Sequence, residues 1–344
     1  MTMTDRYTIL RPEACGLFEH RLHDLYRQTA SLTAAEELEH RRPAYCKVFL
    51  SDAKNQMPQL LSSDFYHEFL VNIPNTVIEQ PPLSGCKIAL LVKTSGVGEP
   101  AEEIFHSIRL TDEEVGDADS YVQTRILFDR YLELAHAAGY DICHNLVRTW
   151  IYINNIDATY AGVVEARNDV FDTLGLRADT HYVASTGIGG ATEGRKVCVA
   201  MDFLTMPSAN DVNTRYLKAL DHLNPTHEYG VAFERGTRVT LSGGKQMFFI
   251  SGTASIDKSG QVVHVGDVAR QTDRLLENIG ALLADGGATM ADIQYFIIYL
   301  RDLSDYAVVN AKMQQLYPLT PRVIVEAKVC RPGWLIEMEC IAEK

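Results

Sequence analysis

The sequence is short of positive charge and of long apolar runs, and both shortages exclude classes of function. It has 32 Lys and Arg against 45 Asp and Glu, a net charge of -13. Nucleic acid is not expected as the main partner, because phosphate binding needs a basic surface. No apolar run approaches the roughly 18 residues of a membrane helix, so no membrane partner is expected. The opening residues also lack the basic start and apolar core of a signal peptide, so we expect a cytoplasmic globular protein.

Metal-binding and cofactor motifs are also missing. The seven cysteines include no Cys-x-x-Cys pair, which favours buried free thiols over disulfides or zinc. No His-Glu-x-x-His motif or clustered acidic loop is present, so we expect no metal and no cofactor. The glycine-rich stretch at 186–196 is not a phosphate loop, because Gly194 is followed by Arg195 and Lys196 without the hydroxyl residue that holds magnesium. We interpret it as a glycine turn.

The chain repeats itself at a constant offset of 148 residues. The matched pairs are Gln123 and Gln271, Thr124 and Thr272, Leu127 and Leu275, Leu134 and Leu282, Gly139 and Gly287, and Asp157 and Asp305. Each half predicts an amphipathic helix, a glycine stop, an apolar strand and a second helix, after a strand that ends in Ser-Gly. The order β-β-α-β-α-β, present twice, predicts an α+β fold of two domains, each a sheet with two helices packed on one face.

The repeat also suggests domain limits. We expect an N-terminal extension (1–85) packing on the first repeat, a first domain (86–205), a connector (206–234) and a second domain (235–344). A sheet covered by helices on one side leaves its other face bare. We therefore expect sheet to pack against sheet, either between repeats or between subunits.

The last strand carries two carboxylates among aliphatic residues. Two extended runs flank Arg331-Pro332-Gly333, which predicts a β-hairpin. Period-two alternation places Glu337 and Glu339 on the face that also carries Leu335 and Ile341. A carboxylate in such a half-buried seam is costly unless it has a partner or a role. For Glu337 the alternatives are a catalytic role or a structural ion pair, whereas Glu339 is interpreted as structural.

The second copy resembles the Rid family, the YjgF-type small trimeric proteins often labelled endoribonuclease L-PSP or translation initiation inhibitor. The resemblance rests on FISGTASID, HVGDVARQTDRLLENIGALL, YLRDLSDYAVVN and IEMECIAE. It implies a homo-oligomer, trimeric or pseudo-trimeric, that binds a small carboxylic acid in clefts between subunits. It also implies that Arg322 grips the ligand carboxylate and that Glu337 assists hydrolysis of an imine or enamine. Asn310 and the turn of Ser251 and Gly252 match positions that line the cleft.

The first copy departs from this pattern. It has Ala184-Ser185 where the second has Pro321-Arg322, and Ala200 lies near the position where a counterpart of Glu337 is missing. Its stretches VRTWIYINNID, YAGVVEARNDVF and STGIGG, with PTHEYGVAFERG in the connector, are similar to the chorismatases, two-repeat relatives of the Rid family. That resemblance implies cleavage of the enol ether of chorismate to pyruvate and a hydroxylated benzoate or cyclohexadiene acid.

Such a reaction needs a carboxylic acid that is protonated near neutral pH. Burial raises the pKa of a carboxyl group, so Glu337 suits the role of general acid, with its conjugate base activating water. A dicarboxylate needs two cationic grips, for which the candidates are Arg322, Arg148 and Arg167, and Tyr229 is a candidate for the pocket lining. The alternatives are surface salt bridges for Arg148 and Arg167, and a packing role for Tyr229.

Three functions remain open on this basis. The first is a chorismatase-like hydrolase or lyase. The second is an imine or enamine deaminase, which needs only one carboxylate grip. The third is a non-catalytic protein that binds small carboxylates. Fold alone does not choose among them, because function is carried by sites and not by scaffolds.

Overall fold

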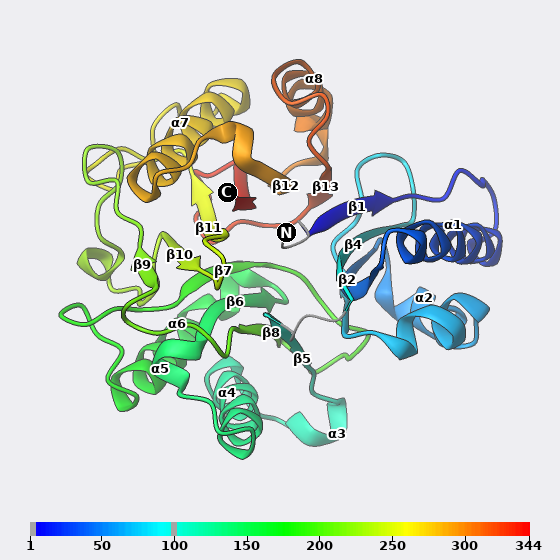
Figure 1. Cartoon of the computed structure of the whole chain (residues 1–344), viewed down its shortest axis with the longest axis horizontal. Coiled ribbons are helices and arrows are strands. Elements are labelled where there is room, and N and C mark those ends of the chain that lie inside the picture. Colours follow the sequence, from blue (N-terminus) through cyan, green and yellow to red (C-terminus); the bar gives the residue numbers. More distant parts are fainter. Residues whose placement is uncertain (1–4, 98–101) are drawn as a thin grey trace.

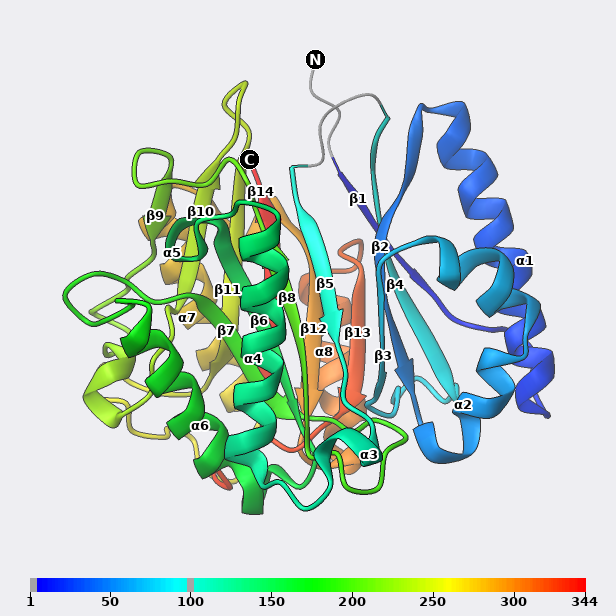
Figure 2. The same ribbon diagram turned by 90° about the horizontal axis from the view of Figure 1, so that it is seen from below.

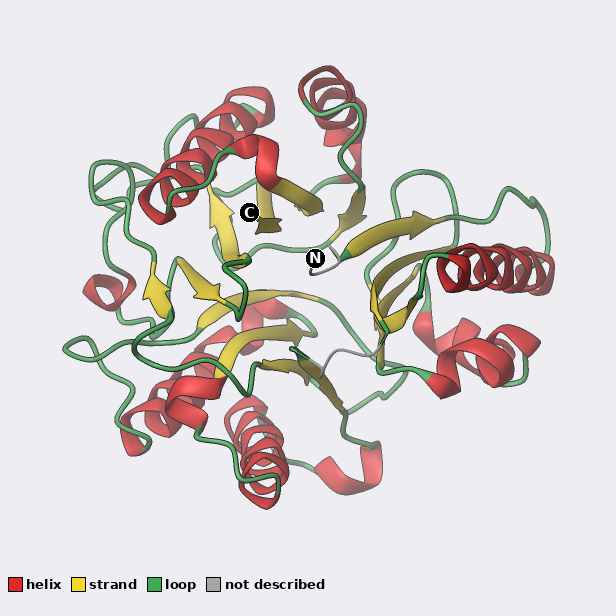
Figure 3. Ribbon diagram, in the orientation of Figure 1, coloured by secondary structure: helices red, strands yellow, loops and turns green. Residues whose placement is uncertain are grey.

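Three β-sheets surround a common centre, and the helices cover their outer faces (Figures 1 and 3). This computed structural model describes residues 5–97 and 102–344. Figure 2, seen from below, shows the N-terminal sheet facing the other two, with α1 and α2 on its far side. Within the described ranges, no helix is both long and apolar enough to cross a membrane.

The N-terminal unit is a four-stranded sheet in the order β1-β4-β2-β3. Its elements are β1 (Arg6–Leu10), α1 (Phe18–Leu38), β2 (Arg41–Leu50), α2 (Ala53–Leu61), β3 (Asn75–Glu79) and β4 (Ile88–Gly96), with short helical turns at Phe65–Phe69 and Leu70–Asn72. Strand β2 runs parallel to β3 and antiparallel to β4, and β4 runs antiparallel to β1.

The middle unit has the same arrangement, with strand order β5-β8-β6-β7. Its elements are β5 (Ile104–Ile108), α3 (Asp112–Val115), α4 (Ser120–Ala137), α5 (Ile142–Asn145), β6 (Leu146–Ile153), α6 (Ile156–Thr173), β7 (Ala184–Gly189) and β8 (Val199–Thr205). Strand β6 is parallel to β7 and antiparallel to β8, as β2 is to β3 and β4.

The C-terminal unit repeats the arrangement a third time within a six-stranded sheet, β13-β12-β14-β11-β10-β9. Its elements are β9 (Thr214–Tyr216), β10 (Gly236–Thr240), β11 (Gln246–Ala254), α7 (Val268–Gly286), β12 (Ile293–Leu300), α8 (Tyr306–Leu316), β13 (Arg322–Glu326) and β14 (Ile336–Glu343), with 3-10 turns at Thr226–Tyr229, Met290–Asp292 and Leu303–Asp305.

The predicted α+β fold and its repeat are confirmed, down to single side chains. Gln123 on α4 and Gln271 on α7 each donate Nε2 hydrogen bonds to two backbone carbonyls. Each also accepts a backbone N–H, from Cys198 at 2.8 Å and from Leu335 at 2.9 Å respectively. The identical glutamines therefore tie their helices to equivalent points before the last strand.

The strand pairing corrects two predictions. The sequence predicts that the strand ending in Ser95-Gly96 opens the first domain (86–205), but this strand is β4, which pairs with β1 and β2 and belongs to the sheet of the N-terminal unit. Residues 6–96 thus form a third unit of the same topology, and not an extension. The predicted hairpin around Arg331-Pro332-Gly333 is wrong as well, because β12 lies between β13 and β14 and pairs with both.

The bare faces of the three sheets meet at the centre, as sheet-to-sheet packing predicts. Tyr45 of β2, Trp150 of β6 and Tyr299 of β12 belong to one continuous buried cluster. The outer faces bury helix stripes instead, for example Leu275 and Ile279 of α7. The central faces also bury charged pairs among their aromatic residues, for example Lys47 of β2 with Asp202 of β8.

Candidate active site

A cavity lies in the seam between β7 of the middle unit and β11 and β14 of the C-terminal unit. Hydrogen bonds from backbone N–H groups to side-chain hydroxyl groups join the two units here: the Ser185 N–H donates to Ser251 Oγ at 2.9 Å, and the Gly252 N–H donates to Thr186 Oγ1 at 2.9 Å. The side chains that line the cavity include Tyr160, Arg167, Tyr229, Phe233, Arg235, Cys330, Arg331, Trp334 and Glu337. One carboxyl group and three guanidinium groups therefore converge on one space.

Glu337 is the only carboxyl group among the described residues that line this cavity. Its residue is 4% exposed, and it forms no ion pair within the described parts of the chain, so the structural ion pair considered for it is not present. Burial, and next the nearby Glu339 carboxylate, raise the pKa of Glu337 to about 8, against the opposing charges of Arg148 and Arg235. The group is therefore protonated at neutral pH.

Gly252 fixes the position of this carboxyl group. Strand β14 sets Glu337 opposite Ala254 of β11, beside an irregularity in the pairing between Ile250 and Thr253. A Cβ on Gly252 would clash with Glu337 Oε1 and displace the carboxyl group. Glycine thus lets the backbone of β11 approach the carboxyl group closely.

Arg167 enters the cavity from α6 with free hydrogen-bonding capacity. Its residue is 2% exposed, and its Nε and Nη2 atoms are buried without partners in the described structure. A buried guanidinium without a carboxylate is costly, and burial lowers its pKa from the ordinary value. The alternative of a surface salt bridge is wrong for Arg167, because its guanidinium is buried and pairs with no carboxylate in the described structure. Its placement fits a carboxylate grip, although that role stays a prediction.

Two further arginines line the cavity, and the sequence analysis did not identify either of them as a site residue. Arg235 is buried, donates to the Asn224 carbonyl oxygen at 3.0 Å and stacks 5.5 Å from the Tyr229 ring. Arg331 is half-buried and lies 4.8 Å from the rings of both Tyr229 and Trp334. Tyr229 was expected at the pocket, and it lines the cavity. The signal for Arg235 was PTHEYGVAFERG, which carries both Tyr229 and Arg235 but whose spacing does not indicate which side chains turn inward.

Arg148, a predicted carboxylate grip, lies elsewhere. It is buried on β6, where Nη2 donates to Glu339 Oε2 at 2.9 Å and to Thr186 Oγ1 at 2.5 Å. Trp150 Nε1 donates to the other Glu339 oxygen at 2.6 Å. Glu339 therefore neutralises the charge of Arg148 in a buried ion pair, and neither residue lines the cavity of Glu337. The structural interpretation of Glu339 is confirmed.

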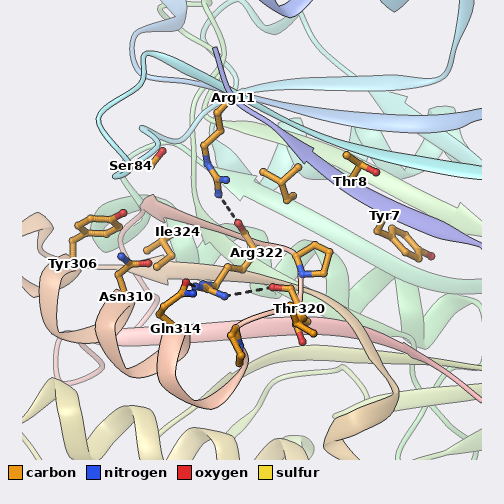
Figure 4. A pocket seen from close by; sticks show the side chains of 14 residues that line it. Tyr7, Thr8, Arg11, Ser84, Tyr306, Asn310, Gln314, Thr320, Arg322 and Ile324 are labelled. Atoms are coloured by element: carbon orange, nitrogen blue, oxygen red, sulfur yellow. Dashed lines mark hydrogen bonds between the residues drawn. The ribbon is translucent and has the colours of Figure 1, made fainter. Parts of the chain in front are cut away.

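Arg322 and Asn310 lie in a different cleft, between the N-terminal and C-terminal units (Figure 4). The guanidinium of Arg322 donates to the carbonyl of Tyr317 at 2.9 Å and to the side chain of Gln314. Arg322 and Glu337 therefore do not line one cavity, contrary to the shared site that the sequence predicts. The reason is that Arg322 begins β13 at the edge of the sheet, whereas Glu337 lies on β14 two strands away.

Ser251 and Gly252 both lie in the seam that holds Glu337, but their roles differ from each other. Ser251 Oγ accepts from the Ser185 N–H and donates to the Glu234 carbonyl oxygen at 2.5 Å, so it is used in joining the two units. Gly252 lines the cavity directly. In the described ranges, no group of three or more His, Cys, Asp or Glu side chains is placed to hold a metal ion.

The chain folds into units of one α+β topology that pack sheet against sheet, and one seam between units holds a cavity lined by a carboxyl group and arginines. This arrangement is a repeated Rid-like fold. The family model described as Endoribonuclease L-PSP matches residues 221–344. The 3-aminoacrylate deaminase RutC of Acinetobacter baylyi is 34% identical over 96 residues, which are 27% of this chain and 76% of that protein. A RutC family protein of Pyrococcus abyssi is 38% identical over 99 residues, 28% of this chain and 77% of that protein.

The chain belongs to this family, the Rid or YjgF proteins of the Endoribonuclease L-PSP type. The crystal structure of a chorismatase matches with a TM-score of 0.69 and covers 99% of both chains, at 18% sequence identity. That likeness extends the fold assignment to the whole chain, including the N-terminal unit that the family model does not reach.

Proposed function

We propose that this chain is a chorismatase-type hydrolase or lyase, which cleaves the enol ether of chorismate, or of a closely related small carboxylic acid, to pyruvate and a hydroxylated benzoate or cyclohexadiene carboxylate. The observation that carries the proposal is the cavity in which a buried Glu337 meets Arg167 and Arg235. An acid that is protonated at neutral pH, beside two buried cations, is what a dicarboxylate enol ether requires. The whole-chain likeness to a chorismatase supports the proposal at the level of fold.

The carboxyl group of Glu337 supplies the proton. It donates H⁺ to the terminal CH₂ carbon of the enol, which becomes a methyl group and leaves an oxocarbenium ion. The Glu337 carboxylate then removes a proton from water as the water oxygen bonds to the oxocarbenium carbon, next to the new methyl group. In the resulting hemiketal the bond between that carbon and the ether oxygen breaks, the hemiketal hydroxyl proton passes to the ether oxygen, which stays on the ring as a hydroxyl group, and pyruvate leaves. One water is consumed on this hydrolytic route, which gives the dihydroxylated cyclohexadiene acid; a hydroxylated benzoate forms from it by loss of one water from the ring. A pKa of about 8 keeps the acid form dominant at neutral pH.

The arginines hold the two carboxylates. Arg167 has two unpartnered nitrogen atoms, so it can form a two-point contact with one carboxylate. Arg235 is the second grip, and its charge is felt by Glu337. The cavity is narrow, about 60 Å³, so a ring-sized substrate requires a side chain to move. Arg331 is the candidate, because it is held by ring contacts and one hydrogen bond of 3.3 Å to the Gly260 carbonyl oxygen.

An imine or enamine deaminase is the second candidate, favoured by the similarity to a 3-aminoacrylate deaminase. The same acid would protonate an enamine carbon, and water would then displace ammonia. This reaction needs one carboxylate grip, so it leaves the second buried arginine of the cavity without a function. A small-carboxylate binder without catalysis would leave the raised pKa of Glu337 without a function. We therefore place both below enol-ether cleavage.

The described residues that line the cavity all come from the middle and C-terminal units of one chain. Three units of one topology already surround the centre in a single chain. The pseudo-trimeric arrangement expected from the repeats is thus built internally, and a homo-oligomer and a cytoplasmic location stay predictions. Sedimentation of the purified chain measures the first of these.

The test is pyruvate release from chorismate, followed by coupling to lactate dehydrogenase and NADH, with ammonia release from an enamine substrate measured in parallel. We expect pyruvate from the wild type, and a loss of at least 100-fold in kcat for Glu337→Gln, which keeps the shape but has no proton to donate. The control is Glu193→Gln, an exposed glutamate away from the cavity. Ammonia without pyruvate would replace the proposal by the deaminase, and neither product from folded protein would replace it by binding.

A further inference from the structure

An indole N–H in the cavity of Glu337 has no acceptor. Trp334 lines this cavity and is 6% exposed, and its Nε1 atom is buried without a hydrogen-bond partner in the described structure. The indole group donates one hydrogen bond and accepts none, and a buried donor that stays unpaired is costly. The other tryptophan of the chain, Trp150, is also buried, but its Nε1 donates to Glu339 Oε1 at 2.6 Å. An unpaired donor at the wall of a cavity therefore indicates that a ligand supplies its acceptor.

The backbone on both sides of Trp334 is tied to helix α7. Gln271 Nε2 donates to the Gly333 carbonyl oxygen at 2.9 Å, and the Leu335 N–H donates to Gln271 Oε1 at 2.9 Å. The Trp334 backbone N–H donates to the Arg331 carbonyl oxygen at 3.0 Å. The fold therefore holds the indole at the cavity wall by hydrogen bonds that do not involve its own N–H.

The ring of Trp334 is reached from the cavity when Arg331 moves. The guanidinium of Arg331 lies 4.8 Å from the ring centres of Trp334 and Tyr229. This arginine is the side chain whose movement is proposed above to admit a ring-sized substrate. The same movement removes the guanidinium from the face of the Trp334 ring, so the indole and the substrate then share the cavity.

The charged groups of the cavity leave a neutral acceptor for this donor. Arg167 and Arg235 are the grips for the two carboxylates of the proposed substrate, and Glu337 gives its proton to the enol carbon. The neutral acceptors that remain on chorismate are the ether oxygen and the ring hydroxyl. A donor on the ether oxygen would withdraw electrons from the enol and oppose its protonation, the first step of the proposed reaction. The ring hydroxyl is therefore the partner that fits Trp334.

We propose that Trp334 determines substrate specificity by donating a hydrogen bond from Nε1 to the ring hydroxyl oxygen of the substrate, so that the cavity rejects an analogue with an amino group at that place. An ammonium group has no lone pair to accept from the indole, and the guanidinium groups that line the cavity repel it. A site built to hydrogen-bond a substrate hydroxyl discriminates strongly against an analogue that cannot form the bond. The inference rests on the proposed function for its choice of substrate.

Nuclear magnetic resonance of protein labelled with nitrogen-15 tryptophan tests the hydrogen bond directly. The chain has two tryptophans, so the spectrum contains two indole N–H signals, and Trp334→Phe assigns them. Glu337→Gln binds chorismate without turnover, and its ligand-free spectrum is compared with that of the wild type. We expect chorismate to move the Trp334 signal downfield, as for an N–H that gains an acceptor. The Trp150 signal is the internal control, because its N–H is already bonded to Glu339.

The amino analogue 4-amino-4-deoxychorismate separates the ring hydroxyl from the other acceptors. It keeps both carboxylates and the ether oxygen, so we expect it to leave the Trp334 signal without the downfield shift. In kinetics, Trp334→Phe should lower kcat/KM for chorismate about tenfold and change kcat/KM for the amino analogue by less than about twofold. Tyr140→Phe is the matched control, because it removes a polar group from an aromatic side chain outside the cavity.

The outcomes distinguish this inference from the proposed reaction. Pyruvate release with equal kcat/KM in the wild type and folded Trp334→Phe would overturn the inference alone. Equal downfield shifts from chorismate and the amino analogue would also overturn it, because the acceptor would then be a group that both share. A Trp334 shift with chorismate but no pyruvate from the wild type would support the inference and overturn the reaction. Absence of chorismate binding would overturn both. Circular dichroism of each variant establishes that it is folded.

Discussion

Replacing Glu337 by glutamine should change how the stability of this protein depends on pH. The substitution keeps the size of the side chain and removes its titration. Burial raises the pKa of Glu337 from 4.5 to about 8 in the folded chain. A carboxyl group with a raised pKa stabilises the fold fully below the unfolded value, and this contribution is lost as pH rises toward the folded value. The relevant window is thus about pH 4.5 to 8.

The magnitude follows from proton linkage. Within the window the folded chain holds one proton that the unfolded chain has released, so the free energy of unfolding falls by about 1.4 kcal/mol per pH unit. Across the full window the loss reaches roughly 5 kcal/mol. Glu337→Gln lacks this loss. Relative to the wild type, the variant should therefore gain about 1.4 kcal/mol per pH unit up to about pH 8, and no more above it.

Urea unfolding of both proteins between pH 5 and pH 9 measures this difference, with refolding used to establish reversibility. Subtracting one curve from the other removes the titration of all groups that the proteins share. A difference that stays constant from pH 5 to pH 8 would refute the reasoning, because it would mean that Glu337 ionises in the fold as it does in water. The general-acid role would then lose its physical basis.

Three further predictions follow from contacts in and near the cavity. Arg148→Met should lower the free energy of unfolding by about 3–5 kcal/mol, because it leaves the buried Glu339 carboxylate without its ion-pair partner. The double variant Arg148→Met/Glu339→Leu should recover most of this stability, as measured by urea unfolding. Gly252→Ala should lower kcat at least tenfold, because the new methyl group displaces the Glu337 carboxyl group. The same substitution should lower the free energy of unfolding by about 1–3 kcal/mol. An unchanged kcat would contradict the placement of the Glu337 carboxyl group beside Gly252. Arg167→Gln should raise KM for chorismate by tenfold or more with a folded protein, measured by pyruvate release, whereas an unchanged KM would remove this residue as a carboxylate grip.

Local sequence patterns determined the elements of each repeat. The amphipathic helix and the second helix predicted in the second half are α7 and α8. Glu337 is singled out by its place between aliphatic residues on one strand face and by the resemblance to the Rid family, and burial raises its pKa as expected, whereas its catalytic role stays a prediction. These inferences succeeded because helix and strand periodicity, and the cost of burying a carboxylate, act within one element.

The relation between units was decided only by tertiary structure. The N-terminal unit shares the topology of the others without their sequence pattern, since a sheet position tolerates many apolar residues that fill the same space. Whether an arginine serves a ligand or an ion pair depends on what the neighbouring unit places beside it. Arg148 meets Glu339, Arg167 meets an open cavity, and Arg322 meets Arg11 in another seam. Sequence fixes which residues carry charge, but the packing of units around a common centre fixes which charges are left free to bind.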